Sequence, residues 1–306
     1  MSQFDLAVLG ADDPLGEVFL KNLEDREIPV GRLFPLVHGD PEGIQAFRGE
    51  EWPWMAAEDF DYSQVQALVV ASPLPAYRSV VESLRKARPA MPILTPDQIV
   101  PGPAQALARL LRVLSALGKV EHVMASISLP VALAGRAGLD ELIHQSRGLF
   151  NMESPDPEVF PLQIAFNMIP VLEGGEIRYG PTSLASGVAA LTQGLRPGCM
   201  VAWMPVLYGG ATALQVRMDR PLEIDALRQA LRHQEGICLM ESDLPAGNPT
   251  PATDSLESAD IFLGQLSVGE QDIRVWLIYD PLRIESEQMA DVVENWIEKP
   301  ANSVIT

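Results

Sequence analysis

Cysteine, histidine and basic side chains are scarce in this chain of 306 residues. The two cysteines are Cys199 and Cys238, and 22 basic residues stand against 41 acidic ones, which gives a formal net charge of −19. Two cysteines cannot complete a four-ligand zinc site, and the four histidines lack metal-ligand spacing, so no metal site is predicted. An acidic surface repels phosphate, which excludes a general nucleic-acid binder and disfavours an anionic membrane. The histidines are His38, His122, His144 and His233.

Long apolar runs are also missing. No stretch of about 18 apolar residues occurs, so no transmembrane helix is expected. The opening MSQFDLAVLG lacks a basic region and enters a strand-like pattern at once, so it does not resemble a signal peptide. With only two cysteines in addition, the sequence predicts a reduced, cytoplasmic protein.

The chain is rich enough in apolar residues, at 47%, to fold around more than one core, and its length favours two domains. The first part alternates strand-like and helix-like segments. Such alternation predicts an α/β fold with a Rossmann-type parallel sheet in an N-terminal domain. The expected strands are 4–9, 32–37, 66–71 and 91–94, and the expected helices start at Pro14 and cover 75–87 and 102–117.

The pattern changes after about residue 122. Longer segments alternate apolar and polar residues, which predicts an α+β domain whose mixed or antiparallel sheet has one exposed face. A helix with apolar residues at helical spacing follows at 285–298. We therefore expect a dinucleotide-binding-like domain of residues 1–123 with the returning helix 285–306, and a second domain of residues 124–284. The expected strands of the second domain are 122–128, 199–207, 212–218, 260–266 and 273–279, and its expected helix is 138–148.

One segment is typical of a dinucleotide site. Gly10 to Gly16 stands at a strand-to-helix turn, where glycines let backbone N–H groups approach a pyrophosphate. Gly10, Ala11 and Gly16 are the candidate cofactor-binding residues. Asp13 replaces the middle glycine of the pattern and would repel phosphate, so a tight turn that binds no ligand is the stronger interpretation. Neither cysteine has the setting of a nucleophile, and both read as buried structural residues.

Several segments together resemble a known family. In chain order they are Gly10–Gly16, Ser126–Leu142, Phe166–Pro170, Met204–Val206 and Asp280–Arg283. Their order and spacing are similar to those of the aspartate-β-semialdehyde dehydrogenases, and within that family to its divergent Usg-type paralogues. The resemblance implies a Rossmann-type domain, a dimerisation domain and a returning C-terminal helix. It also implies descent from NADP-dependent enzymes of amino-acid biosynthesis.

The same resemblance implies that the catalytic groups are gone. Enzymes of the family form an acyl-enzyme on a cysteine, and the matching position here is Pro101. The family's histidine falls on Gly210 and its active-site glutamine on Leu129. The residues that would read the NADP phosphate are replaced by the segment 38–40, which contains Asp40. Loss of the nucleophile alone normally costs several orders of magnitude in rate.

We therefore expect a catalytically degenerate homologue that is not an enzyme and has no catalytic residues. It would act as a homodimeric binding or structural protein, alone or with a protein partner that the sequence does not identify. No cofactor is expected, and NADP or NAD would bind only if the vestigial site still works. Two alternatives stay open: an NAD(P)-dependent oxidoreductase that forms no cysteine acyl-enzyme, and a small-molecule sensor that uses the old cleft.

Overall fold

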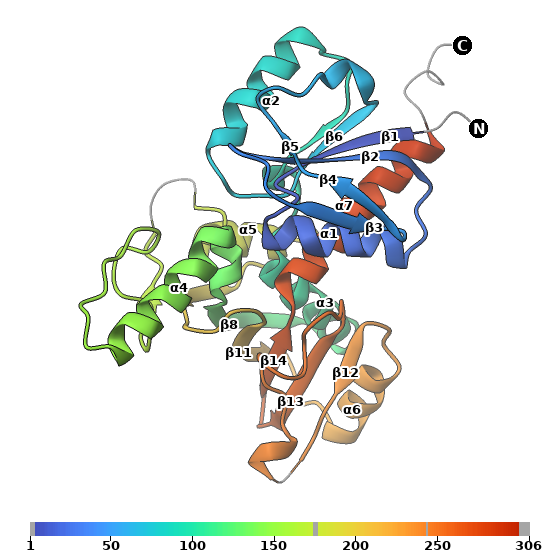
Figure 1. Cartoon of the computed structure of the whole chain (residues 1–306). Coiled ribbons are helices and arrows are strands. Elements are labelled where there is room, and N and C mark those ends of the chain that lie inside the picture. Colours follow the sequence, from blue (N-terminus) through green and yellow to red (C-terminus); the bar gives the residue numbers. More distant parts are fainter. Residues whose placement is uncertain (1–3, 174–176, 243, 300–306) are drawn as a thin grey trace. The chain divides into compact units, whose positions relative to one another are not determined.

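The computed structural model describes residues 4–173, 177–242 and 244–299. They divide into two units, Met1–Ile99 with Glu285–Thr306 and Val100–Ile284 (Figure 1). Within the described ranges, no helix is both long enough and apolar enough to cross a membrane.

The first unit is built on a five-stranded sheet in the order β5-β2-β1-β6-β7, with every pair parallel. This confirms the predicted Rossmann-type parallel sheet. The central strand β1 is apolar except for Asp5, and its last five residues are buried, because parallel sheets are covered on both faces. The strands are β1 (Phe4–Leu9), β2 (Val30–Val37), β5 (Met55–Ala56), β6 (Ala67–Val70) and β7 (Ile93–Leu94). The helices α1 (Pro14–Asp25) and α2 (Ala76–Ala87) connect them, and a hairpin of β3 (Ile44–Phe47) and β4 (Glu50–Pro53) follows β2.

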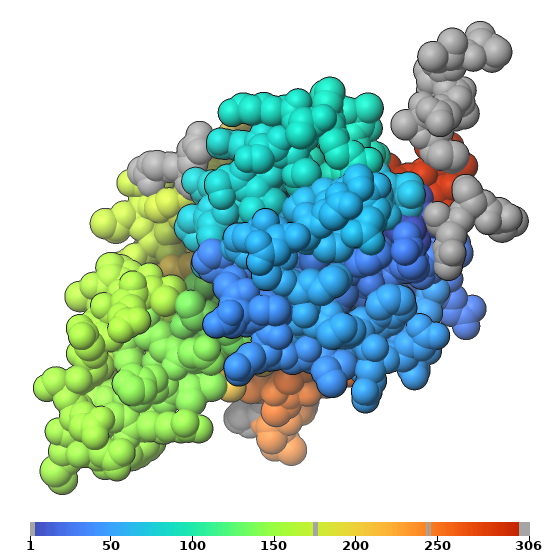
Figure 2. All heavy atoms as spheres, turned by 45° about the horizontal axis from the view of Figure 1, so that its top comes forward, coloured from blue at the N-terminus to red at the C-terminus, as the bar shows by residue number. Residues whose placement is uncertain are grey.

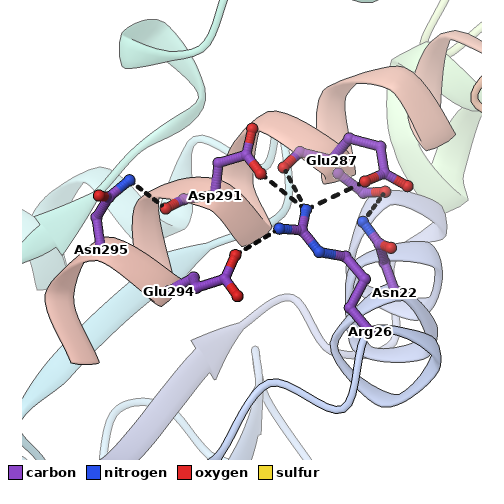
Figure 3. Close-up of polar contacts among 7 residues, drawn as sticks. Asn22, Arg26, Glu287, Asp291, Glu294 and Asn295 are labelled. Carbon is purple, nitrogen blue, oxygen red and sulfur yellow. Dashed lines mark hydrogen bonds and ion pairs between the residues drawn. The ribbon is translucent and has the colours of Figure 1, made fainter. Parts of the chain in front are cut away.

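The helix α7 (Pro281–Glu298) returns to this unit from Glu285 onwards and is tied to α1 by a charge network (Figure 3). Arg26 at the end of α1 reaches the carboxylates of Glu287 at 3.1 Å, Asp291 at 2.8 Å and Glu294 at 2.6 Å. These carboxylates lie one turn apart on α7, so one guanidinium can contact all three. Beside them, the amide of Asn22 donates to the hydroxyl of Ser286.

The second unit contains a seven-stranded mixed sheet in the order β12-β13-β14-β11-β8-β10-β9. The pairs β10–β8 and β12–β13 are parallel and the others antiparallel, as predicted for the second domain. The strands are β8 (Val120–Leu129), β9 (Ile169–Pro170), β10 (Gly198–Trp203), β11 (Gly210–Met218), β12 (Ile237–Leu239), β13 (Ile261–Val268) and β14 (Asp272–Tyr279). The helices are α3 (Gly102–Leu117), α4 (Gly135–Phe150), α5 (Pro181–Leu191) and α6 (Ile224–Arg232).

The two faces of this sheet differ. Side chains that alternate along β8 and β11 are buried, among them Val123, Ile127, Leu214 and Val216, while their neighbours in the sequence are exposed. The helices α3, α5 and α6 pack against β8, β10 and β12. We call the other surface the open face; it carries His122, Met124, Ser126, Met200, Ala213, Gln215, Arg217, Arg274 and Trp276.

The helix α3 lies in a different unit from the one expected. We placed residues 1–123 together, whereas α3 and the start of β8 belong to the second unit. The physical reason is that α3 packs against α5, with Ala104 beside Gly187. The predicted bounds of α3 are nevertheless the observed ones, Gly102–Leu117.

Candidate functional site

The turn between β1 and α1 is shaped by its two glycines. Gly10 has φ of +80°, which glycine adopts without strain, and a Cβ on it would lie 2.4 Å from the Cβ of Ser72. A Cβ on Gly16 would lie 1.9 Å from the carbonyl oxygen of Gly10. Both glycines are therefore required by packing, whether or not a cofactor binds. A cofactor role for Gly10, Ala11 and Gly16 stays a prediction.

A carboxylate of the chain itself occupies the N-terminus of α1. Asp13 stands at the N-cap position, yet its side chain makes no capping hydrogen bond. Its Oδ2 accepts a hydrogen bond from the hydroxyl of Ser72 at 2.6 Å, and the N–H of Leu74 donates to the same hydroxyl oxygen at 3.1 Å. Helix N-termini attract anions. Here the buried Asp13 supplies the anion from within the chain.

The carboxyl ends of β2 and β5 add further acidic groups to this edge of the sheet. His38 follows β2 and its Nδ1 contacts Glu58, which follows β5. Burial alone would raise the pKa of Glu58, but hydrogen bonds from the backbone and from His38 lower it below its ordinary value. Tyr77 of α2 is buried beside His38. Burial raises the pKa of Tyr77 well above its usual range, and the charges of Asp12 and Asp13 add to that effect.

In the second unit, Leu129 and Gly210 lie at the same end of the sheet. The register that pairs Ala211 with Ser128 brings the two positions together on β8 and β11, and Leu129 also pairs with Trp203. Leu129 is completely buried. The structure thus brings together two of the three positions at which the resemblance places catalytic groups, and neither Leu129 nor Gly210 has a group that could act as an acid or a base.

The space that a side chain at Gly210 would need is filled by Tyr279. Gly210 and Tyr279 are paired across β11 and β14, and a Cβ on Gly210 would lie 2.6 Å from Cε2 of the ring. The ring is completely buried, and its hydroxyl forms a hydrogen bond of 3.0 Å with the hydroxyl of Thr212. The neighbouring Gly209 also has no room for a side chain, because a Cβ added to it would lie 2.0 Å from the carbonyl oxygen of Pro251.

The start of α3 is equally tight. Pro101 is the buried N-cap residue of α3 and lies beside Gly187 of α5. A Cβ on Gly102 would lie 2.3 Å from the carbonyl oxygen of Pro281. Backbone therefore packs directly against backbone at Gly102.

The two cysteines do not stand out as nucleophiles. Both are partly buried, and burial raises the pKa of Cys199 to about 11, with a contribution from the charge of Glu173. A thiol with a raised pKa is a poor nucleophile at neutral pH. Among the residues that the structure describes, no group of three or more His, Cys, Asp and Glu side chains could hold a metal ion.

Sequence reasoning identified the glycine turn and Asp13 but missed Ser72, Tyr77 and Tyr279. Ser72 lies 59 residues from its partner Asp13, and Tyr279 lies 69 residues from Gly210, so local residue spacing could not indicate either contact.

The sequence analysis also missed a cavity of about 350 Å³ on the open face. The residues around that cavity include Met124, Met200, Gln215, Gln265, Arg274 and Trp276.

The chain is similar to proteins of known sequence and structure. A family model described as "Semialdehyde dehydrogenase, dimerisation domain" matches residues 110–284, which is more than half of the chain and lies within the second unit. A USG-1 protein homolog of Azotobacter vinelandii is 26% identical, over 94% of this chain and 97% of that protein. Aspartate-semialdehyde dehydrogenase 2 of Vibrio cholerae is 28% identical, over 92% of this chain and 94% of that protein.

Solved structures share the fold. The crystal structure of aspartate semialdehyde dehydrogenase II from Vibrio cholerae has a TM-score of 0.78 at 20% identity, over 98% of this chain and 100% of that chain. The structure of a probable aspartate-semialdehyde dehydrogenase from Pseudomonas aeruginosa also has a TM-score of 0.78 at 20% identity, over 95% and 98% of the two chains. These values confirm the fold class expected from the sequence.

Proposed function

This chain belongs to the semialdehyde dehydrogenase family, and we propose that within it the chain is a homodimeric homologue that does not carry out the dehydrogenase reaction. The observation that carries the proposal is the buried ring of Tyr279 against Gly210. A position that had merely lost a histidine would leave a space. Here the space is filled by a fully buried side chain, so the packing itself has no room for the former group.

The first expected result is the absence of turnover. Purified protein is assayed with aspartate semialdehyde, phosphate and NADP, and in the reverse direction with aspartyl phosphate and NADPH. Without a nucleophile at Pro101 and a base at Gly210, the rate should fall several orders of magnitude below the roughly 10 s⁻¹ of an ordinary enzyme. Turnover within about a hundredfold of that value would overturn the proposal.

The second expected result is weak binding of the cofactor. A pyrophosphate at the N-terminus of α1 would meet the carboxylates of Asp12 and Asp13, and a 2′-phosphate would meet Asp40. The buried carboxylate of Asp13 already places a negative charge at this end of the helix. Calorimetric titration with NADP and with NAD should therefore give no dissociation constant below about 1 mM, equivalent to roughly −4 kcal/mol. A low-micromolar constant would instead favour a non-covalent oxidoreductase.

The third expected result is a dimer in solution. A sheet of seven strands at about 4.8 Å spacing is roughly 29 Å across, and eight residues of strand extend about 26 Å. The open face therefore offers roughly 750 Å² per protomer, close to the roughly 800 Å² per partner of a standard stable interface. Repulsion from the net charge of −19 is screened beyond about 8 Å at physiological salt. Light scattering should give twice the 33.3 kDa of one chain.

A further inference from the structure

We propose that the chain closes its own dinucleotide crevice, because Asp13 and Ser72 tie together the two turns between which a pyrophosphate would have to enter. The inference rests on the proposed function and deepens it, since it names the contact that excludes the cofactor. All the groups involved belong to the first unit.

The crevice lies at the point where the strand order of the parallel sheet reverses. In the order β5-β2-β1-β6-β7, the chain passes from β1 to β2 on one side and later to β6 on the other side of β1. In open α/β sheets, ligands bind outside the carboxyl ends of the two strands at which the order reverses. Here these strands are β1, which is followed by the turn into α1, and β6, which is followed by the turn into α2.

A buried hydrogen bond joins these two turns. The hydroxyl of Ser72, in the turn after β6, donates to Oδ2 of Asp13, in the turn after β1, at 2.6 Å. Both side chains are buried. The N–H of Leu74 donates to the same hydroxyl oxygen at 3.1 Å, so the hydroxyl acts as donor and acceptor at once. Hydrogen bonds to a carboxylate are among the strong ones, and this bond therefore holds the two turns together.

The two turns also touch directly. A Cβ on Gly10 would lie 2.4 Å from the Cβ of Ser72, so no further group fits between these two residues. Pro73 and Pro75 restrict the turn after β6, because proline fixes its own φ. In the first unit, the teal part of the chain, which contains α2, lies directly against the blue part (Figure 2).

The turn after β1 has few backbone donors left for a pyrophosphate, although dinucleotide folds bind it through N–H groups at this turn. The N–H groups of Gly10 and Ala11 both donate to the carbonyl oxygen of Leu36, at 2.8 and 3.3 Å. The N–H of Asp13 donates to the carbonyl oxygen of Gly10 at 3.1 Å, and Pro14 has no N–H. Of the five residues 10–14, all of which the structure describes, four therefore have no N–H to offer.

The residues present thus do not fit a pyrophosphate, and the misfit is more than a repulsive charge. A neutral side chain of the same size in place of Asp13 would still accept a hydrogen bond from Ser72 and would still precede Pro14. If the closure itself excludes the cofactor, removing the charge alone has no effect, whereas opening the turn does.

An opened variant tests the inference. It carries Asp13→Gly, which restores the glycine of the dinucleotide pattern, and Pro14→Ala, which restores an N–H. Calorimetric titration with NAD is the measurement, because NAD has no 2′-phosphate to meet Asp40. The opened variant should bind NAD at least tenfold more tightly than the unaltered chain. Asp13→Asn removes the charge but keeps the size and an acceptor for Ser72. It is the matched control and should leave the affinity unchanged.

A second opened variant, Asp13→Ser with Pro14→Ala, keeps the test valid if the first fails to fold. Serine is a favoured N-cap residue, and its side chain is shorter than that of aspartate. This variant should also bind NAD more tightly than the unaltered chain. Without nucleotide, the urea-unfolding midpoint of both opened variants should fall, since both lose the hydrogen bond between Asp13 and Ser72.

The possible outcomes separate this inference from the proposed function. Low-micromolar binding of NAD by the unaltered chain would refute the closure and the proposed lack of cofactor binding together. Folded opened variants that bind NAD no better than the unaltered chain would refute the closure and leave the proposed function standing. A gain with Asp13→Asn as large as that of the opened variants would also refute the closure, because charge repulsion alone would then explain the weak binding.

Discussion

Replacing Gly210 by histidine, the residue type that the family resemblance puts there, should lower the free energy of unfolding by about 3 kcal/mol and produce no dehydrogenase activity. The added Cβ would lie 2.6 Å from the ring of Tyr279. That ring is completely buried, and its hydroxyl is hydrogen-bonded to Thr212, so it has no free space to enter. The strand backbone would have to shift instead. Urea unfolding monitored by tryptophan fluorescence measures the loss.

A double-mutant cycle identifies Tyr279 as the cause. Tyr279→Ala alone should cost about 3–5 kcal/mol, because it empties a large buried site. When Gly210→His and Tyr279→Ala are combined, the total should be smaller than the sum of the two single effects, since the imidazole can enter the space that the ring leaves. Additive costs would mean that the strain at Gly210 has another source. An unchanged midpoint for Gly210→His would contradict the packing argument for the proposed absence of dehydrogenase activity.

The parts of the fold that depend on local periodicity could be predicted. The run 4–9 and the amphipathic segment 102–117 have patterns that fix both their type and their bounds, and the structure has them at those residues. The surface against which an apolar helix face packs could not be predicted in this way. The pattern of α3 says that one side is buried, but the pattern is the same whether that side packs against α5 or against the parallel sheet. Its place in the second unit therefore could not be read from the sequence.

The contacts of Tyr279 and Asp13 could not be predicted either, because each depends on a residue far away in the sequence. Tyr279 sits in a regular alternation along β14 and reads as an ordinary core residue, because alternation does not record what stands on the next strand. The sequence showed that Asp13 would place a negative charge near a bound phosphate. That it would be buried and bound to Ser72 depends on a contact across 59 residues. Residues 150–161 likewise have the composition of a polar, proline-rich connector, and composition does not show that the backbone of Glu158 and Val159 donates hydrogen bonds to Glu141.

Gly16→Ala should lower the free energy of unfolding of the cofactor-free protein by about 3 kcal/mol, although alanine is the better helix former by roughly 1 kcal/mol. Gly16 lies in the first turn of α1, and the new Cβ would lie 1.9 Å from the carbonyl oxygen of Gly10. Gly10 cannot retreat easily, because its N–H donates to the carbonyl of Leu36 at 2.8 Å. The measurement is urea unfolding without nucleotide.

Gly148→Ala is the matched control, since Gly148 also lies in a helix and its Cβ would meet only ordinary contacts of 3.4 Å or more. At Gly148 the higher helix propensity of alanine should dominate, so the free energy of unfolding should stay unchanged or rise by up to about 1 kcal/mol. The comparison decides why the glycine pattern of a dinucleotide fold is present in a protein proposed to bind none. If Gly16 served only the approach of a pyrophosphate, Gly16→Ala would leave the nucleotide-free protein as stable as before and would change only a shift induced by NADP. A large loss without nucleotide means that the close approach of α1 to β1 is itself what requires glycine.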